Sequence, residues 1–99
     1  MISIKIYKSG NDMIIGACDK NLLGKRFEEG KFQLEVTKEF YGGERIDIKT
    51  FKKYLLEATI ANLVGKLTIK CAIESGFINP NCIIKIDGVP HAQMVKMLT

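Results

Sequence analysis

The sequence is poor in the residue types that build disulfide frameworks, metal sites and histidine-based active sites. Its 99 residues include three cysteines, Cys18, Cys71 and Cys82, and a single histidine, His91. An odd number of widely spaced cysteines indicates neither a disulfide framework nor a zinc motif. Each cysteine lies in an apolar stretch, so we expect three buried free thiols in a reducing cytosol. We predict no metal site and no cofactor.

Arginine is also scarce. Arg26 and Arg45 are the two arginines among the 15 basic residues, and the others are lysines. The formal net charge is +4, which permits a polyanionic partner without requiring one. Because reading of base edges favours the bidentate arginine fork, nucleic-acid binding by this chain would be led by phosphate contacts and sensitive to salt. The alternative is that lysine and glutamate form an ordinary solubilising surface.

Long hydrophobic runs are absent. The longest uncharged stretches are interrupted by Asn62 or by glycines and fall short of a membrane span. Residues 1–5 alternate between apolar and polar types and lack the apolar centre of a signal peptide. With 46% hydrophobic and 26% charged residues, the chain has enough apolar surface to form a core. We therefore expect one domain, residues 1–99, in the cytoplasm and not in a membrane.

Alternating residues near the N-terminus predict a β-hairpin. Apolar and polar residues alternate over residues 2–6, residues 9–12 form a turn cluster, and residues 13–18 form the return strand. Residues 19–30 are interpreted as a loop with one short helical turn, because glycines interrupt the apolar spacing. Residues 32–36 alternate again and predict a third strand at a solvated edge.

Two helices are predicted next. Asp47 is a plausible N-cap, and apolar residues recur at helical spacing over residues 48–58. The helical spacing continues over residues 60–71, with a break expected near residues 59–62 because poor helix formers gather there. Gly76 suits the left-handed position that ends the second helix.

The C-terminal part predicts a turn, a strand and a short helix. Residues 79–81 form the turn, and the apolar run 82–86 predicts a buried, central strand. Residues 87–88 turn the chain again, and Pro90 suits the first position of a short helix. The predicted fold is α+β, with a three- to four-stranded antiparallel or mixed sheet and two main helices packed on one face.

Four stretches, taken together, resemble one family. They are FYGG at residues 40–43, ATIANLVG at 58–65, AIESGFI at 72–78 and GVPHAQ at 88–93. In this combination and order they resemble the archaeal domain-of-unknown-function 424 family, whose members are small stand-alone proteins. The resemblance implies an archaeal cytosolic protein with a link to translation and RNA handling. It implies no catalytic residue.

The loop around the paired glycines is the first candidate site. Paired glycines allow positive φ angles and let another molecule approach backbone N–H groups closely. Beside Gly42 and Gly43, the Phe40 or Tyr41 ring could stack on a base and Arg45 could pair with phosphate. The alternative is a tight strand-to-helix turn with Phe40 in the core and Arg45 paired to Glu44 or Asp47. The spacing matches neither a Walker loop nor a dinucleotide-binding fingerprint.

The single histidine is the second candidate. His91 could act as a general base or donate to phosphate, with the Gln93 amide beside it. The alternative is an imidazole satisfied by a backbone carbonyl, since no partner for catalysis is placed next to it.

Two further groups are candidates for binding. A basic helix face could touch phosphate or could be plain solvated surface, and it comprises Lys49, Lys52 and Lys53. Small and polar residues that interrupt the helical pattern could bind an anion at a helix start or could serve as a cap and a packing glycine; they are Thr59, Asn62 and Gly65.

The leading hypothesis is a non-catalytic protein that binds RNA or ribosomal components. One alternative is a small enzyme or nucleotide-binding protein that uses His91 with the Gly42–Gly43 loop. A third hypothesis is an interaction module that forms homodimers through the edge strand at residues 32–36 or through an apolar C-terminal surface. That surface would comprise Met94, Val95, Met97 and Leu98.

Overall fold

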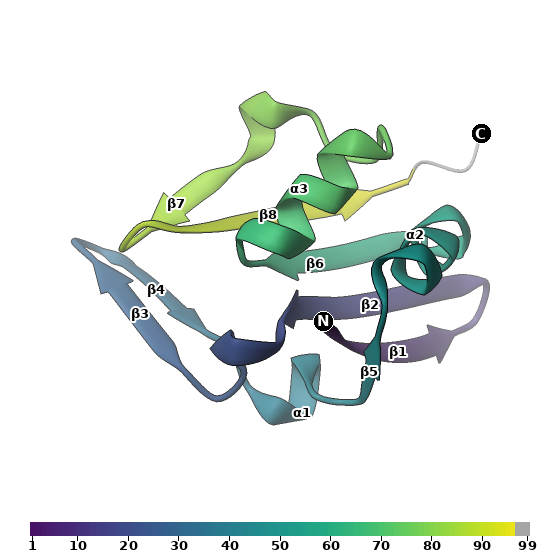
Figure 1. Ribbon diagram of the computed structural model, residues 1–99, viewed down its shortest axis with the longest axis horizontal. Helices are drawn as coiled ribbons and strands as arrows, with labels where there is room; N and C mark the ends of the chain where they lie inside the picture. Colours follow the sequence, from purple (N-terminus) through teal and green to yellow (C-terminus); the bar gives the residue numbers. More distant parts are fainter. Residues whose placement is uncertain (97–99) are drawn as a thin grey trace.

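A computed structural model describes residues 1–96. The fold consists of a mixed six-stranded sheet, helices and a separate two-stranded hairpin (Figure 1). The strands are β1 Ile2–Ser9, β2 Asp12–Asp19, β3 Arg26–Glu29, β4 Phe32–Glu35, β5 Glu44–Ile46, β6 Ile60–Val64, β7 Ile84–Ile86 and β8 Val89–Val95. The helices are α1 Lys38–Tyr41, α2 Ile48–Glu57 and α3 Lys66–Glu74, with short 3₁₀ turns at Lys20–Leu22 and Pro80–Cys82.

The strand order in the main sheet is β5-β1-β2-β6-β8-β7, and β3 and β4 form a two-stranded sheet of their own. All pairs in the main sheet are antiparallel except β2 with β6. The α+β class is therefore confirmed, but the predicted three to four strands are too few. The shortfall arises because β5, β6 and β8 were not recognised as strands.

The N-terminal hairpin matches its prediction. Strands β1 and β2 pair over their whole length, from Ile2 opposite Asp19 to Ser9 opposite Asp12. Alternating apolar residues point to one face, where Ile2 and Ile4 are almost fully buried. The alternation was visible in sequence because the two faces of β1 differ in polarity.

The central strand β6 overturns the predicted start of the second helix, whose helical spacing was expected to run over residues 60–71. Residues 60–64 hydrogen-bond to β2 on one side and β8 on the other, and a helix resumes only at Lys66. Ala61 and Leu63 are buried on one face, while Val64 is buried on the opposite one. A strand covered on both faces shows no polar alternation, so its apolar run can be mistaken for helix.

The C-terminal segment is also a strand rather than a short helix. Asp87 and Gly88 both have positive φ, 52° and 77°, and form the two-residue loop of a β7–β8 hairpin. That turn returns the chain as β8, in which Pro90 lies opposite Lys85. The run 82–86 is not central: its strand β7 lies at the sheet edge, and the Ile84 side chain is 50% exposed.

Helix ends behave as their residues predict. The Asp47 carboxylate accepts a hydrogen bond from the Thr50 backbone N–H at 2.8 Å, which caps α2. Gly76 has φ 77°, and at the end of α3 its N–H donates to the Ile73 carbonyl while Phe77 N–H donates to Ala72. This pair of bonds is a Schellman motif, and it confirms the predicted end of the helix.

The middle of the chain is more ordered than a loop. Residues 19–30 contain a 3₁₀ turn and strand β3, and β4 pairs with β3 instead of forming an edge of the main sheet. The short helix α1 and strand β5 follow, on either side of the paired glycines, where the sequence predicts only a loop or a turn. Strand β5 adds to β1 with Arg45 opposite Ser3.

Two hydrophobic clusters cover the two faces of the main sheet. Helices α2 and α3 lie together on one face, as predicted for the two main helices, and Phe51 and Leu55 of α2 are fully buried there (Figure 1). On the opposite face, α1 and the β3–β4 hairpin bury a smaller cluster that contains Cys18, Leu34 and Val64. The smaller cluster covers the sheet only in part.

Gly16 makes this second layer possible. A Cβ at Gly16 would collide with the Phe40 carbonyl oxygen and lie 3.0 Å from the Phe40 ring. A side chain here would therefore lift α1 away from β2.

Candidate nucleic-acid interface

The paired glycines serve a close turn between α1 and β5. Neither Gly42 nor Gly43 has a positive φ, so the expected left-handed backbone is not the reason for them. A Cβ on Gly42 would lie 2.6 Å from the Lys38 carbonyl oxygen, and one on Gly43 would collide with the Ile4 carbonyl oxygen. Glycine is needed because the chain passes against its own backbone on both sides.

This turn forms one wall of a pocket of about 420 Å³, which we call the basic pocket. Its lining residues are Ser3, Lys20, Leu23, Lys38, Gly42, Gly43 and Arg45. Three of them are basic and exposed, and none is acidic. The three basic residues come from the 3₁₀ turn after β2, from α1 and from β5. The fold therefore brings together positive charges that lie far apart in the sequence.

The cations of the basic pocket do not pair with carboxylates. Within residues 1–96, the salt bridges are those of Arg26 with Glu28 and Glu35, which lie on the β3–β4 hairpin. Arg45 therefore does not pair with Glu44 or a neighbouring acid, as the tight-turn alternative assumed. Unpaired basic groups around a concave surface suit an anion, and the phosphate of a nucleic acid is one.

Tyr41 lies under the pocket and not in it. Its side chain is buried in the smaller cluster, packed edge-on against Phe40 with ring centroids 4.9 Å apart. Burial, together with the neighbouring Cys18 thiol, raises the pKa of Tyr41 to about 12. A ring held in this way does not offer its face to a base.

Phe40 and Tyr7 form the accessible aromatic pair instead. Their rings stack with centroids 5.6 Å apart and planes 21° apart, and both are half-buried. The Tyr7 hydroxyl donates to the Glu39 carbonyl oxygen, and the Lys5 ammonium lies 5.5 Å from the Tyr7 ring centroid. Phe40 was one of the two rings predicted to stack on a base, but nothing in the sequence indicated that it would pair with Tyr7 of β1.

His91 and Gln93 lie on β8, away from the basic pocket. The His91 Nδ1 atom lies 3.1 Å from the Leu63 carbonyl oxygen. Because a carbonyl only accepts, Nδ1 donates the proton, and this is the backbone-satisfied histidine of the alternative interpretation. Gln93 is exposed and lies directly opposite Asn62 of β6.

The glycine turn and the β8 residues share a face of the sheet but not a pocket. Pairing runs from Arg45 to Ser3, Cys18, Val64 and His91, so all five positions face the side away from α2 and α3. Four strand spacings of about 4.8 Å separate Arg45 from His91 by roughly 19 Å. Buried Cys18 and Val64 lie between them, and His91 does not line the basic pocket. The structure thus does not bring His91 and the Gly42–Gly43 loop into one site, as the enzyme hypothesis requires.

Beyond the smaller cluster, the same face of the sheet is open to solvent. This open strip consists of Ile14, Ile60, Asn62, Gln93 and Val95, which are half-exposed or exposed. The Tyr7–Phe40 pair borders it, because Tyr7 is opposite Ile14 and Phe40 lies over Gly16. Apolar, aromatic and amide groups on one flat surface are the components used to stack and read unpaired bases.

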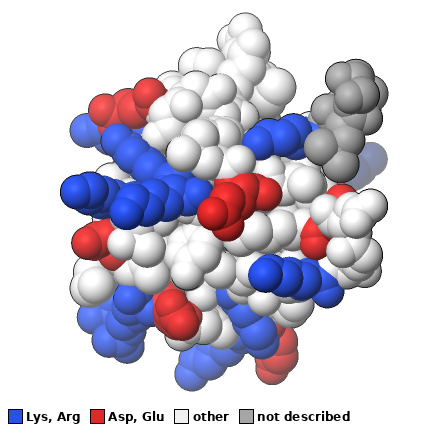
Figure 2. Space-filling model, turned by 90° about the vertical axis from the view of Figure 1, so that its right-hand side faces the viewer, with Lys and Arg blue, Asp and Glu red and all other residues white. Residues whose placement is uncertain are grey.

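The α2 lysines lie elsewhere. Helix α2 packs on the other face of the sheet, and its solvent side carries three exposed lysines, Lys49, Lys52 and Lys53. On the face drawn in Figure 2, several blue side chains adjoin one another towards the left edge, and elsewhere blue side chains lie among red and white ones. These lysines are consistent with a solvated helix surface.

The polar interruptions near residue 60 have structural partners. The Thr59 hydroxyl accepts from the Met13 backbone N–H at 3.0 Å and lies 3.1 Å from an Asp12 carboxylate oxygen. Asn62 lies within β6 and caps no helix. Gly65 has φ 110° and abuts the Asp19 carboxylate, which accepts hydrogen bonds from the first turn of α3.

The cysteines are free, as expected, but only two are buried. Cys18 and Cys71 are buried, whereas Cys82 is exposed, so the prediction of three buried thiols is wrong for Cys82. Burial and the adjacent Asp19 raise the pKa of Cys18 to about 12. Among residues 1–96, no three His, Cys, Asp or Glu side chains gather as metal ligands would, and no helix there is long and apolar enough to cross a bilayer.

The predicted dimer surfaces lie at the C-terminus and on the β3–β4 hairpin. Met97 and Leu98 lie outside the described residues. Of the rest, Val95 is 61% exposed and Met94 is half-buried against the main core. Phe32, in the other predicted contact strand, is 59% exposed at the β3–β4 hairpin.

Comparison with known proteins assigns the family. The sequence profile described as "Protein of unknown function (DUF424)" matches residues 7–97. The chain belongs to this family. The DUF424 assignment confirms the resemblance carried by the four sequence stretches, and it names no activity. No curated protein matches the chain.

The fold of this DUF424 protein recurs in a solved structure. That structure is the crystal structure of an uncharacterized conserved protein from Methanopyrus kandleri, with a TM-score of 0.78 and 22% sequence identity. The alignment covers 99% of this chain and 95% of that chain. At this level of identity the similarity establishes a common fold only.

Proposed function

We propose that this protein is a non-catalytic cytoplasmic protein that binds RNA or RNA-containing ribosomal components. Phosphate groups bind in the basic pocket, and unpaired bases lie on the open strip beside the Tyr7–Phe40 pair. The observation that carries the proposal is the convergence of Lys20, Lys38 and Arg45 on one pocket with no acidic lining residue.

Charge and chemistry support this assignment of roles. The formal net charge of +4 favours approach to a polyanion, and lysine contacts add affinity without sequence preference. The stacked Tyr7 and Phe40 rings offer a stacking surface for a base, and the Asn62 and Gln93 amides can donate to and accept from base edges. The bases must be unpaired, because a flat sheet face cannot reach base edges inside an A-form helix.

Binding to single-stranded RNA across a salt series tests the proposal. We expect fluorescence anisotropy with a labelled mixed-sequence 20-mer to show binding that weakens as salt rises. The triple variant Lys20→Ala, Lys38→Ala, Arg45→Ala should bind at least about ten-fold more weakly and with a shallower salt dependence.

A second triple variant is the matched control. Lys49→Ala, Lys52→Ala, Lys53→Ala removes the same formal charge from α2 and should weaken binding much less. Equal losses in the two triple variants would mean that net charge alone attracts RNA. Absence of binding by the unmodified protein even at low salt would overturn the proposal.

The open strip has its own variant. Gln93→Ala, at an exposed position, should weaken binding of single-stranded RNA and leave the weak attraction of a duplex unchanged. Equal effects on single strands and duplexes would leave the phosphate-binding role of the pocket standing and remove the base-binding role of the strip.

A further inference from the structure

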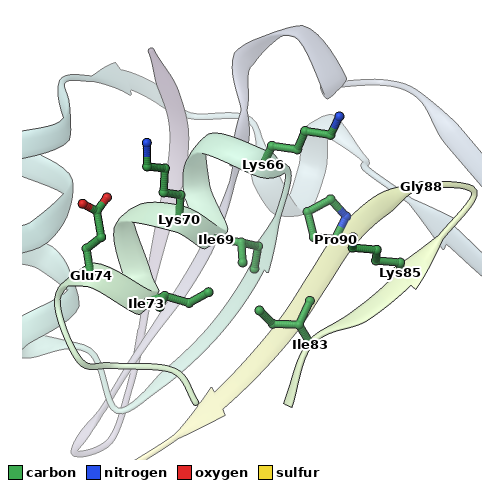
Figure 3. Close-up of a pocket in the computed structure, with 9 residues that line it drawn as sticks. All are labelled: Lys66, Ile69, Lys70, Ile73, Glu74, Ile83, Lys85, Gly88 and Pro90. Carbon is green, nitrogen blue, oxygen red and sulfur yellow. The ribbon is translucent and has the colours of Figure 1, made fainter. Parts of the chain in front are cut away.

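A groove on the opposite side of the sheet has a different chemistry. It lies between α3 and the β7–β8 hairpin, on the face that carries α2, and has a volume of about 360 Å³ (Figure 3). Its floor is formed by the side chains of Ile69, Ile73, Ile83 and Pro90, which point into the space between the helix and the strands. We call it the α3–β8 groove.

Charged side chains surround this apolar floor. Lys66 and Lys70 rise from α3, and Lys85 comes from β7 on the opposite wall (Figure 3). Glu74, one turn after Lys70, is the acidic lining residue, so the rim carries three positive charges against one negative charge. All four side chains are exposed, and none takes part in a salt bridge among residues 1–96.

We propose that the α3–β8 groove binds a small organic anion that has an apolar body, such as an aromatic or short alkyl carboxylate or sulfonate. The body occupies the floor, where burial of apolar surface stabilises the complex. The anionic group lies at the rim, where Lys66, Lys70 and Lys85 supply the positive charge. The volume is at the lower end of the usual range for ligand pockets, which suits one or two fused rings.

The apolar floor suits a ligand that differs chemically from the RNA of the proposed function. A nucleobase carries donors and acceptors around its edge, and burying them against isoleucine and proline side chains leaves them without partners. The open strip, in contrast, carries the Asn62 and Gln93 amides, which can pair with the edge of a base. The two sites lie on opposite faces of the sheet, so the second site goes beyond RNA binding.

Two fluorescent probes with related ring systems test the proposal. One is the anion 1-anilinonaphthalene-8-sulfonate, and the other is its neutral relative N-phenyl-1-naphthylamine. We expect the anion to bind with one-to-one stoichiometry and to compete with a naphthalene carboxylate. In the triple variant Lys66→Ala, Lys70→Ala, Lys85→Ala, its affinity should fall about ten-fold or more, while binding of the neutral probe should change little.

The α2 triple variant, Lys49→Ala, Lys52→Ala, Lys53→Ala, is the matched control. It removes the same charge from the neighbouring helix on the same face and should leave both probes bound as before. A floor variant, Ile83→Ser, should weaken both probes together, because it removes apolar surface that each one contacts. Unfolding curves of all variants establish that each remains folded under the assay conditions.

Backbone amide NMR shifts locate the bound anion. Shifts that concentrate in α3 and the β7–β8 hairpin support the proposal. It is overturned if the shifts lie elsewhere, if both lysine triple variants weaken the anion equally, or if the neutral probe binds as strongly as the anion and responds to the same lysines. Binding that appears only with dimerisation would instead identify the groove as a contact between two copies, and this too would overturn it.

Discussion

At the scale of single residues, Asp19 connects two elements that are distant in sequence. One of its carboxylate oxygens accepts from both the N–H and the hydroxyl of Thr68, each at 2.8 Å, and the other accepts from Leu67 N–H at 3.1 Å. Gly65, which precedes α3, contributes no side-chain cap. The end of β2 therefore supplies the cap of α3, a role that no local capping pattern reveals.

Removing this cap should destabilise the whole fold. We expect Asp19→Ala to lower the free energy of unfolding by about 1–2 kcal/mol, because Leu67 and Thr68 lose an acceptor in a partly buried site. Asp19→Asn keeps one acceptor oxygen for Thr68 and should lose roughly half as much. Urea unfolding followed by circular dichroism measures both, and an alanine variant as stable as the parent would contradict the capping role.

The three thiols should differ in reactivity. Cys82 is exposed, whereas Cys18 is buried with a pKa raised to about 12 and Cys71 is buried with its pKa raised mainly by burial. Because the thiolate is the reactive form, we expect one fast thiol in native protein at pH 8 and three after unfolding. Ellman's reagent counts them. Cys82→Ser should abolish the fast phase, and a remaining fast thiol would show that a buried cysteine is accessible.

At the scale of elements, helix α2 and strand β6 show what local patterns reveal. Helix α2 buries one side, with Phe51 and Leu55, and exposes the other to solvent. The helical spacing of its apolar residues was therefore visible in the sequence. Strand β6 contacts helices on one face and, through Val64, the smaller cluster on the other. Its apolar residues follow from its central place in the sheet, and sequence spacing alone could not separate it from the helices around it.

The N-cap of α2 makes a prediction about pH. Hydrogen bonds from Thr50, with a smaller contribution from Lys49 and Lys53, hold the pKa of Asp47 below its usual value. A lowered pKa in the folded state means that the cap stabilises the protein above the ordinary carboxyl pKa. That stabilisation is lost as pH falls through the lowered folded-state pKa.

Thermal unfolding of Asp47→Ala against the parent protein checks this sign. The difference in Tm should be largest between about pH 5 and pH 7 and should shrink as Asp47 becomes protonated. Asp47→Asn, a neutral cap, is the control and should show a difference that depends less on pH. A Tm gap that grows on acidification would contradict the assignment.

At the scale of the whole molecule, the order of strands controls what lies together. The parallel pair β2 and β6 is joined by a connection of about forty residues that contains β3, β4, α1, β5 and α2. Through this connection, the 3₁₀ turn with Lys20, α1 with Lys38 and β5 with Arg45 meet at one end of the sheet. The functional proposal depends on that topology more than on any one motif.

The same topology predicts a gradient of local stability. Strand β6 hydrogen-bonds on both sides and has both faces at least partly covered, whereas most residues of the β3–β4 hairpin are exposed. We expect β6 amides to exchange with solvent only through global unfolding and β3–β4 amides to exchange through smaller local openings. Hydrogen exchange followed by NMR tests this, and equal protection in β6 and the hairpin would contradict it.

The sequence by itself determined the features that depend on near neighbours. These are the β1–β2 hairpin, the start of α2 at Asp47, the end of α3 at Gly76 and the turn at residues 87–88, where short-range sterics and hydrogen bonds suffice. It also marked the glycine turn and Arg45 as part of a candidate site. Lys20 and Lys38 were not identified, because the residues around them in the chain do not indicate that the fold brings them close to Arg45.

Only the tertiary structure decided the rest. It made residues 60–64 the central strand, it buried Tyr41 while leaving Phe40 beside Tyr7, and it separated His91 from the glycine turn. Each of these outcomes depends on which strand pairs with which, and pairing energies come from contacts between residues far apart in the chain. Local propensity therefore marked where elements begin and end, and long-range packing selected which side chains face one another.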